Sequence, residues 1–105
     1  MALTATGYIF VDESLPATDS NPTFRNPDLA VDYSVGANND VNATLFVLNT
    51  DGAIIRGASF LILEATIDAV TLTTSTTSDK MREAVEKCVR DRLNTLNGST
   101  VITWS

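Results

Sequence analysis

The sequence contains no histidine and only one cysteine, Cys88, among its 105 residues. Histidine is the commonest general base, triad partner and metal-binding side chain, so its absence removes much hydrolytic and metal-dependent chemistry. A single cysteine cannot form an intrachain disulfide, which excludes a disulfide-stabilised secreted scaffold. We therefore expect a protein with no enzymatic activity, no metal or other cofactor, and no small-molecule substrate.

Long apolar runs are also missing. The longest, such as residues 60–63, are far too short to cross a bilayer. The first residues, Met1-Ala2-Leu3-Thr4, lack the basic and apolar regions of a signal peptide. We expect a soluble protein that is made in the cytoplasm and has no membrane partner.

Basic residues are scarce, with seven Lys and Arg against thirteen Asp and Glu and a formal net charge of −6. Outside one C-terminal segment the only basic residues are Arg25 and Arg56, so residues 1–78 are acidic. Because phosphate contacts require clustered basic side chains, this composition argues against an obvious nucleic-acid binder. The basic residues of the C-terminal segment are Lys80, Arg82, Lys87, Arg90 and Arg92.

The length predicts a single domain spanning residues 1–105. With 44% hydrophobic residues, the chain can build a modest core without metal or disulfide support. Stability should be marginal, so burial of surface against a partner would increase it.

Residue alternation predicts three strands in the first half of the chain. Residues 4–11 are rich in β-branched and aromatic types, residues 29–35 alternate apolar with polar, and residues 41–49 have an apolar centre. Residues 12–28 contain three prolines among Ser, Asn and Asp, which predicts an irregular surface segment.

Asp51-Gly52 lies between two apolar runs and predicts a type I′ hairpin turn, because both central positions of that turn need positive φ. A strand over residues 53–67 should then pair antiparallel with 41–49. Its polar face would carry Arg56, Glu64 and Thr66. The alternation shifts near Asp68-Ala69, which predicts a bulge or bend there.

The C-terminal segment predicts an amphipathic helix over residues 79–96. Ser78 is placed to act as N-cap and Asn97-Gly98 as C-cap. Cys88 falls within the apolar stripe, where a small core hydrophobe is a better interpretation than an activated nucleophile. The stripe consists of Met81, Ala84, Val85, Cys88, Val89, Leu93 and Leu96.

The other side of this helix predicts two exposed ion pairs at i,i+4 spacing, Glu83–Lys87 and Glu86–Arg90. The apolar tail at residues 101–105 would either form a last strand or dock on a neighbour.

These elements predict an α+β fold: an antiparallel sheet of four to six strands, with one C-terminal amphipathic helix packing on one face, across a dimer. A helix of about 18 residues spans only ~27 Å and leaves apolar sheet uncovered. Uncovered sheet and exposed edges favour association with a second copy, for which an isologous dimer is the simplest arrangement.

Two segments resemble the coat proteins of single-stranded RNA bacteriophages. Residues 3–16 (LTATGYIFVDESLP) are similar to the opening strand and following loop of that family. Residues 65–72 (ATIDAVTL), leading into 75–82 (STTSDKMR), are similar to its last strand, which runs through a capped turn into a helix. The order of strands, hairpin and capped helix also resembles that family.

The resemblance implies a homodimer with a continuous sheet, assembly into an icosahedral capsid around genomic RNA, and localisation in the virion. Its implied RNA contacts, on the exposed sheet face, are Arg56, Thr44 and Thr66. Its implied self-association and helix-packing residues are Met81, Val85, Cys88, Val89, Leu93 and Leu96.

Two other classes remain open. A decoration, head-completion or tail component of a bacteriophage would need no nucleic-acid contact and would suit the acidic composition. A small metabolite-binding or enzymatic domain is the least supported, because the sequence lacks histidine and any site motif.

Overall fold

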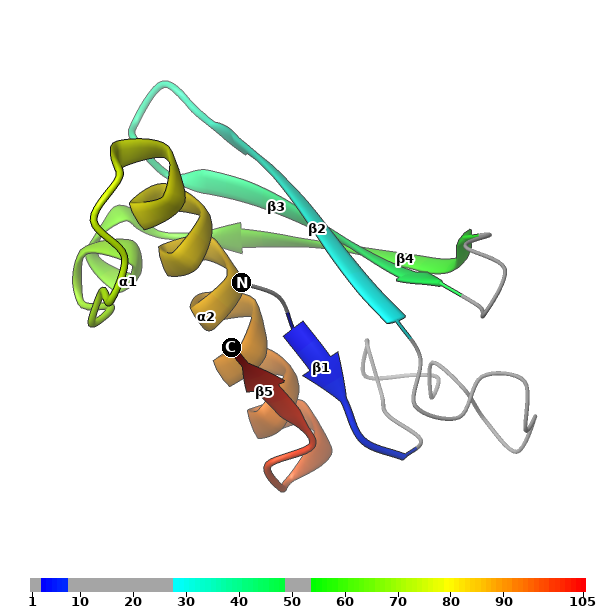
Figure 1. The fold of residues 1–105 in the computed structure, drawn as a ribbon. Helices are drawn as coiled ribbons and strands as arrows, with labels where there is room; N and C mark the ends of the chain where they lie inside the picture. Colours follow the sequence, from blue (N-terminus) through cyan, green and yellow to red (C-terminus); the bar gives the residue numbers. More distant parts are fainter. Residues whose placement is uncertain (1–2, 8–27, 49–53) are drawn as a thin grey trace.

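The computed structural model describes residues 3–7, 28–48 and 54–105, and within 54–58 it describes only the main chain. Figure 1 shows a sheet with one long helix packed against it. The elements, in chain order, are β1 (Leu3–Ala5), β2 (Asp28–Val35), β3 (Val41–Leu48), β4 (Ile54–Ile62), α1 (Glu64–Asp68), α2 (Thr77–Asn97) and β5 (Ile102–Trp104).

The strands form one antiparallel sheet in the order β4-β3-β2-β1-β5. Strands β2 and β3 pair along their whole length, from Asp28 opposite Leu48 to Val35 opposite Val41. Strand β1 pairs with all three residues of β5 but meets β2 only where Thr4 lies opposite Asp28. The predicted α+β fold, with an antiparallel sheet and a C-terminal helix on one face, is confirmed.

Strands β3 and β4 pair antiparallel, as the hairpin predicted, with a shift of register between Val47 and Leu48. The Asp51-Gly52 turn itself lies outside the described residues, as do residues 8–11 of the predicted first strand and residues 12–27 of the predicted irregular segment. In the described part of that first strand, β1 covers Leu3–Ala5.

The predicted strand over 53–67 is wrong beyond Ile62, because residues 64–68 form the short helix α1. Its first amide, Glu64 N, donates to Asp40 Oδ1 at 3.1 Å, and Ile67 N donates to Leu63 O at 3.1 Å. Ile67 and Val70 both pack against the core, and their i,i+3 spacing suits a helical turn, whereas in a strand the two would point to opposite faces. Of the two alternatives predicted near Asp68-Ala69, a bulge in a strand is therefore wrong, whereas a bend is observed: the chain turns at Ala69 and bends at Val70, directly after α1.

Helix α2 begins at Thr77 and ends at Asn97, slightly longer than predicted. The N-cap is Thr76 and not Ser78: Lys80 N donates to Thr76 O at 2.9 Å, and the Thr76 hydroxyl is hydrogen-bonded to the Asp79 carboxylate. Gly98 adopts the left-handed conformation, with φ of 70°, which confirms the predicted C-cap.

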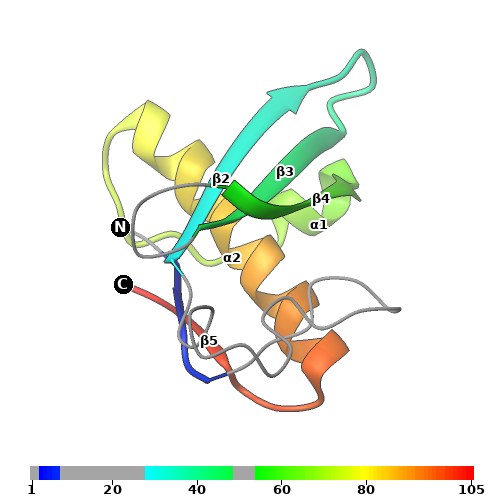
Figure 2. The ribbon, with the colours of Figure 1, turned by 90° about the vertical axis from the view of Figure 1, so that its right-hand side faces the viewer.

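Helix α2 lies along one face of the sheet, with β1 and β5 beside its C-terminal half (Figures 1 and 2). In β3 the residues at odd positions from Val41 to Val47 are buried, whereas the alternate residues are half-buried or exposed. Among the described residues, no helix covers the opposite face of the sheet, which we call the open face. The core consists mainly of Val31, Val41, Ala43, Leu45, Val47, Phe60, Ile62, Val85, Cys88, Val89, Leu93 and Ile102.

The C-terminal tail forms β5, and Ile102 is fully buried in the same core. The first of the two predicted outcomes for the tail, a last strand, is the one observed. No helix in the described ranges is long and apolar enough to cross a membrane.

Truncation of Leu93 tests the contact between helix and sheet. This side chain is fully buried, so Leu93→Ala should lower the free energy of unfolding by about 2–5 kcal/mol, measured by urea denaturation. Leu72→Ala is the control, since Leu72 is 42% exposed and its truncation should change stability by about 0.5 kcal/mol at most. Equal losses in the two variants would contradict the assigned core.

Candidate functional site

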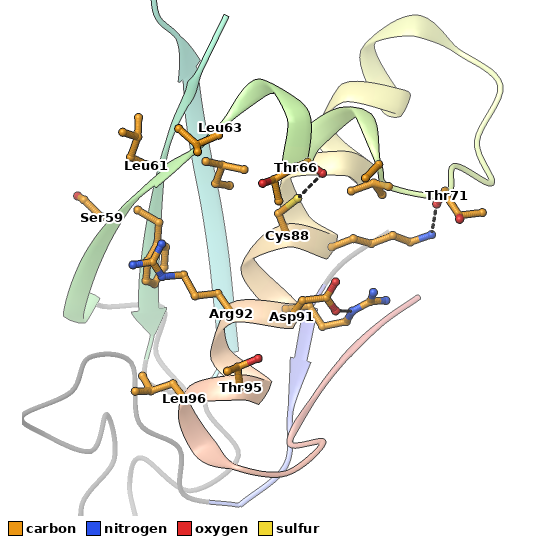
Figure 3. A pocket seen from close by; sticks show the side chains of 16 residues that line it. Ser59, Leu61, Leu63, Thr66, Thr71, Cys88, Asp91, Arg92, Thr95 and Leu96 are labelled. Atoms are coloured by element: carbon orange, nitrogen blue, oxygen red, sulfur yellow. Dashed lines mark hydrogen bonds and ion pairs between the residues drawn. The ribbon is translucent and has the colours of Figure 1, made fainter.

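A groove lies between β4, α1 and the C-terminal half of α2, with a volume of about 1210 Å³ (Figure 3). We call it the α2–β4 groove. Its walls come from residues 59–63, from the segment 66–71, and from one side of the helix. The helical lining residues are Lys87, Cys88, Arg90, Asp91, Arg92, Thr95 and Leu96.

The strand side of the groove is mainly apolar, with Ser59 as its polar member. Phe60 and Ile62 are buried beneath it, whereas Leu61 and Leu63 are each 55% exposed. Large aliphatic side chains exposed together at the end of a terminal strand favour contact with a further apolar surface. The same strand, β4, has β3 on one side and no described residue paired on the other.

The helix side of the groove is basic. The Arg92 guanidinium lies 4.9 Å from the centre of the Phe60 ring and so covers part of the core. Arg90 Nε donates to Asp91 Oδ1 at 2.9 Å in an exposed ion pair. The predicted Glu86–Arg90 pair is not formed: among described partners Arg90 is paired with Asp91, and Glu86 is buried.

Cys88 lies at the base of the groove and is buried. Its Sγ is 3.8 Å from Thr66 O (Figure 3). Burial raises the pKa of the Cys88 thiol, and the Asp91 carboxylate raises it further against the opposing effect of Arg90. Cys88 belongs to the buried hydrophobic cluster, which confirms the prediction that it packs in the core, and a thiol with a raised pKa is a poor nucleophile.

A buried ion pair lies beside the groove, where the sequence predicted an exposed one. The Glu83 side chain is fully buried, and its Oε2 lies 2.6 Å from Lys87 Nζ. Four further donors reach the carboxylate at 2.7–3.0 Å: the amides and hydroxyls of Thr73 and Thr74. A buried carboxylate is costly unless its oxygens are satisfied, and here they are.

These donors also set the protonation state of Glu83. Burial acts to raise the pKa of Glu83, but the hydrogen bonds from Lys87, Thr73 and Thr74 outweigh it and hold the pKa well below its usual range. Glu83 is therefore ionised in the folded chain and anchors the irregular segment before α2 to the helix.

Lys87 and Trp104 extend this cluster to the C-terminal strand. Lys87 Nζ also donates to Thr71 O at 2.9 Å and lies 4.6 Å from the centre of the Trp104 ring. Trp104 Nε1 donates to Glu86 Oε1 at 3.1 Å. The cluster thus joins three separate parts of the chain: the segment 71–74, α2 and β5.

The cluster around Glu83 could not be predicted from the sequence, for a physical reason. Glu83 and Lys87 have the spacing of an ordinary surface pair, and the threonines that bury Glu83 come from an irregular segment nine and ten residues earlier. Local periodicity gives no signal for such a contact. The run of threonines before the helix was the only available sign.

The residues predicted to contact RNA do not share one surface. Thr44 lies half-buried on the open face of the sheet, opposite Asp32 on β2 and Ser59 on β4. Thr66 is on α1 and lines the α2–β4 groove, on the helix side. Arg56 lies opposite Val47 in the register, and its side chain is outside the described residues.

The residues predicted for self-association pack mainly within the chain. Val85, Val89 and Leu93 are fully buried against the sheet. Met81 is partly buried against the same core, and Leu96 is half-buried at the groove. Leu96 is therefore the member of that set that is both apolar and accessible at the groove.

No described group of three or more His, Cys, Asp or Glu residues is placed to hold a metal ion. No family model, curated protein or solved structure matches the chain. The class of protein defined by the fold is thus an α+β domain with one terminal strand bordering an open groove.

Acid titration tests the buried carboxylate. Because the pKa of Glu83 is lower in the folded than in the unfolded chain, ionised Glu83 stabilises the fold at neutral pH. This contribution should decrease as the pH falls below about 4.5, its ordinary value, toward the lowered one. Urea midpoints of the wild type should therefore fall more steeply with acid than those of Glu83→Gln. Glu64→Gln, at an exposed glutamate, is the control; identical slopes for wild type and Glu83→Gln would contradict the assignment.

Removal of Lys87 tests the same pair from the other side. Lys87→Met leaves the Glu83 charge buried without its cation, so it should destabilise the fold clearly by thermal or urea denaturation. Lys80→Met removes an exposed lysine of the same helix and should cost about 0.5 kcal/mol at most. If the two variants were equally stable, the pair would have no structural role.

Proposed function

We propose that this protein is a self-assembling structural subunit, specifically a bacteriophage coat protein, whose copies dimerise by pairing their β4 strands and packing into each other's α2–β4 groove. The observation that carries this proposal is the terminal position of β4 next to that groove. A terminal strand leaves a row of main-chain N–H and C=O groups available to another strand.

Pairing of β4 with β4 of a second copy in antiparallel fashion would join the two sheets into one. A strand pair alone is marginally stable in water, so association also needs apolar burial. Leu61 and Leu63, each 55% exposed, and Leu96 at the groove supply such surface. The arrangement is isologous, because the same strand and groove meet on both copies.

The resemblance to RNA-phage coat proteins supports the more specific part of the proposal, although unequally along the chain. The segment 65–72, which resembles a last strand, forms α1 and irregular chain in this structure. The order of the sheet strands followed by a capped helix is retained. The coat function, a capsid around genomic RNA and localisation in the virion remain part of the proposal on that basis.

A second candidate is favoured by the open face of the sheet. The described polar side chains there include Asp32, Ser34, Asn42, Thr44 and Ser59, with no Lys or Arg among them. RNA phosphates favour basic surfaces. A structural component of a bacteriophage that assembles without binding nucleic acid is therefore the alternative.

One set of measurements separates these functions. Light scattering after size-exclusion chromatography gives the mass, electron microscopy the shape, and absorbance at 260 nm the nucleic-acid content. Closed shells that contain RNA support the coat protein, whereas rings, tubes or empty assemblies support the second candidate. A monomer that persists at high concentration rejects both.

Charge introduced at the β4 end tests the proposed interface. The Leu61→Lys, Leu63→Lys double variant should shift the chain from the associated form to a folded monomer, because paired copies would bring these like charges together and bury them. Leu72→Lys places a charge at another exposed leucine and should leave the mass unchanged. Both variants are measured by light scattering, with circular dichroism to verify folding; a double variant with the wild-type mass would contradict β4 pairing.

A further inference from the structure

The two terminal strands of the sheet differ in the hydrogen bonding of their outward main-chain groups. Strand β4 ends the sheet on one side and β5 ends it on the other. At the start of β5, the outward N–H and C=O groups of Ile102 are hydrogen-bonded by a side chain of α2, that of Asn94. Among the described residues, no side-chain hydrogen bond of this kind reaches β4.

The Asn94 side chain is hydrogen-bonded to both main-chain polar groups of Ile102. Its Nδ2 donates to Ile102 O at 3.0 Å, and its Oδ1 accepts from Ile102 N at 2.8 Å. The same Oδ1 accepts from Val101 N at 3.0 Å. A side-chain amide with one donor and one acceptor thus takes the place of the main chain of a neighbouring strand.

The direction of these bonds identifies the occupied side as the outer one. Thr6 N donates to Val101 O at 2.9 Å, so the Val101 carbonyl faces β1. Successive residues of a strand turn their main-chain groups to opposite sides, so those of Ile102 face away from β1. This outward position is where another copy would have to bond.

We infer that Asn94 restricts association to β4 by closing the β5 edge, so that pairing stops at two copies and does not continue into open-ended rows. The inference rests on the proposed β4 pairing. A sheet with two free edges can pair β4 with β4 and β5 with β5 in alternation, and repetition of two such contacts has no end. A sheet with one free edge yields a pair, which can then enter a closed assembly through other surfaces.

Substitution of Asn94 separates this role from simple anchoring of β5. Asn94→Ala frees both Ile102 groups, and its mass by light scattering should rise with protein concentration beyond the wild-type value, with elongated ribbons in electron microscopy. Asn94→Leu preserves side-chain volume and makes the same test where the alanine variant folds less completely. Asn94→Asp retains the acceptor for both amides and frees only one carbonyl, so it should keep the wild-type mass. Asn38→Ala, in the exposed turn after β2, is the matched control and should also keep it.

Amide hydrogen exchange distinguishes the outcomes further. If Asn94 closes an edge, the Ile102 amide in Asn94→Ala should become protected as the chains associate. A wild-type mass in folded Asn94→Ala and Asn94→Leu, with faster exchange at Val101 and Ile102, would show that Asn94 only anchors β5 and would overturn the inference. A monomeric wild type would refute the proposed β4 pairing itself. An associated wild type whose Asn94 variants keep its mass would refute only the role of Asn94, so the two failures are distinguishable.

Discussion

Helix α2 alone supplies nearly the whole helical layer over the sheet, and its packing decides what remains exposed. Val85, Val89 and Leu93 join the strands in one hydrophobic cluster. A helix with its side chains is about 10 Å wide, whereas neighbouring strands are about 4.8 Å apart. One helix therefore covers roughly two strand spacings of a five-stranded sheet. The uncovered margin beside β4 is the α2–β4 groove, and no helix in the described part of the chain covers the face away from α2.

Polar contacts attach the segment 71–74 and strand β5 to helix α2, in addition to the apolar packing. The Glu83 carboxylate ties the segment 71–74 to the helix, and Lys87 connects both to Trp104 on β5. Asn94 then bonds the main chain of the same strand. The C-terminal strand is thus held by side chains of α2 in addition to its pairing with β1. This concentration of polar contacts on one side of the molecule contrasts with the apolar surface at the end of β4, which is the basis for proposing that association is one-sided.

Local signals anticipated much of the architecture. Alternation at residues 29–35 and 41–49, the helical stripe centred on Cys88, and Gly98 as a C-cap all correspond to observed features. The strand predicted beyond Ile62 is wrong because the apolar spacing of the segment 63–70 suits both a strand and a helix. There, contacts distant in sequence, such as the bond from Glu64 N to Asp40, accompany the helix in the structure.

The sequence by itself determined that the chain forms an α+β domain with antiparallel strands and one amphipathic helix, because these depend on residue periods that repeat within each segment. Tertiary structure alone decided that Glu83 and Lys87 are buried, that β5 pairs with β1, and which two strands end the sheet. Each of these depends on residues brought together from separate segments. The position of the candidate site follows from strand order, and strand order is set by packing between elements rather than by the pattern within any one of them.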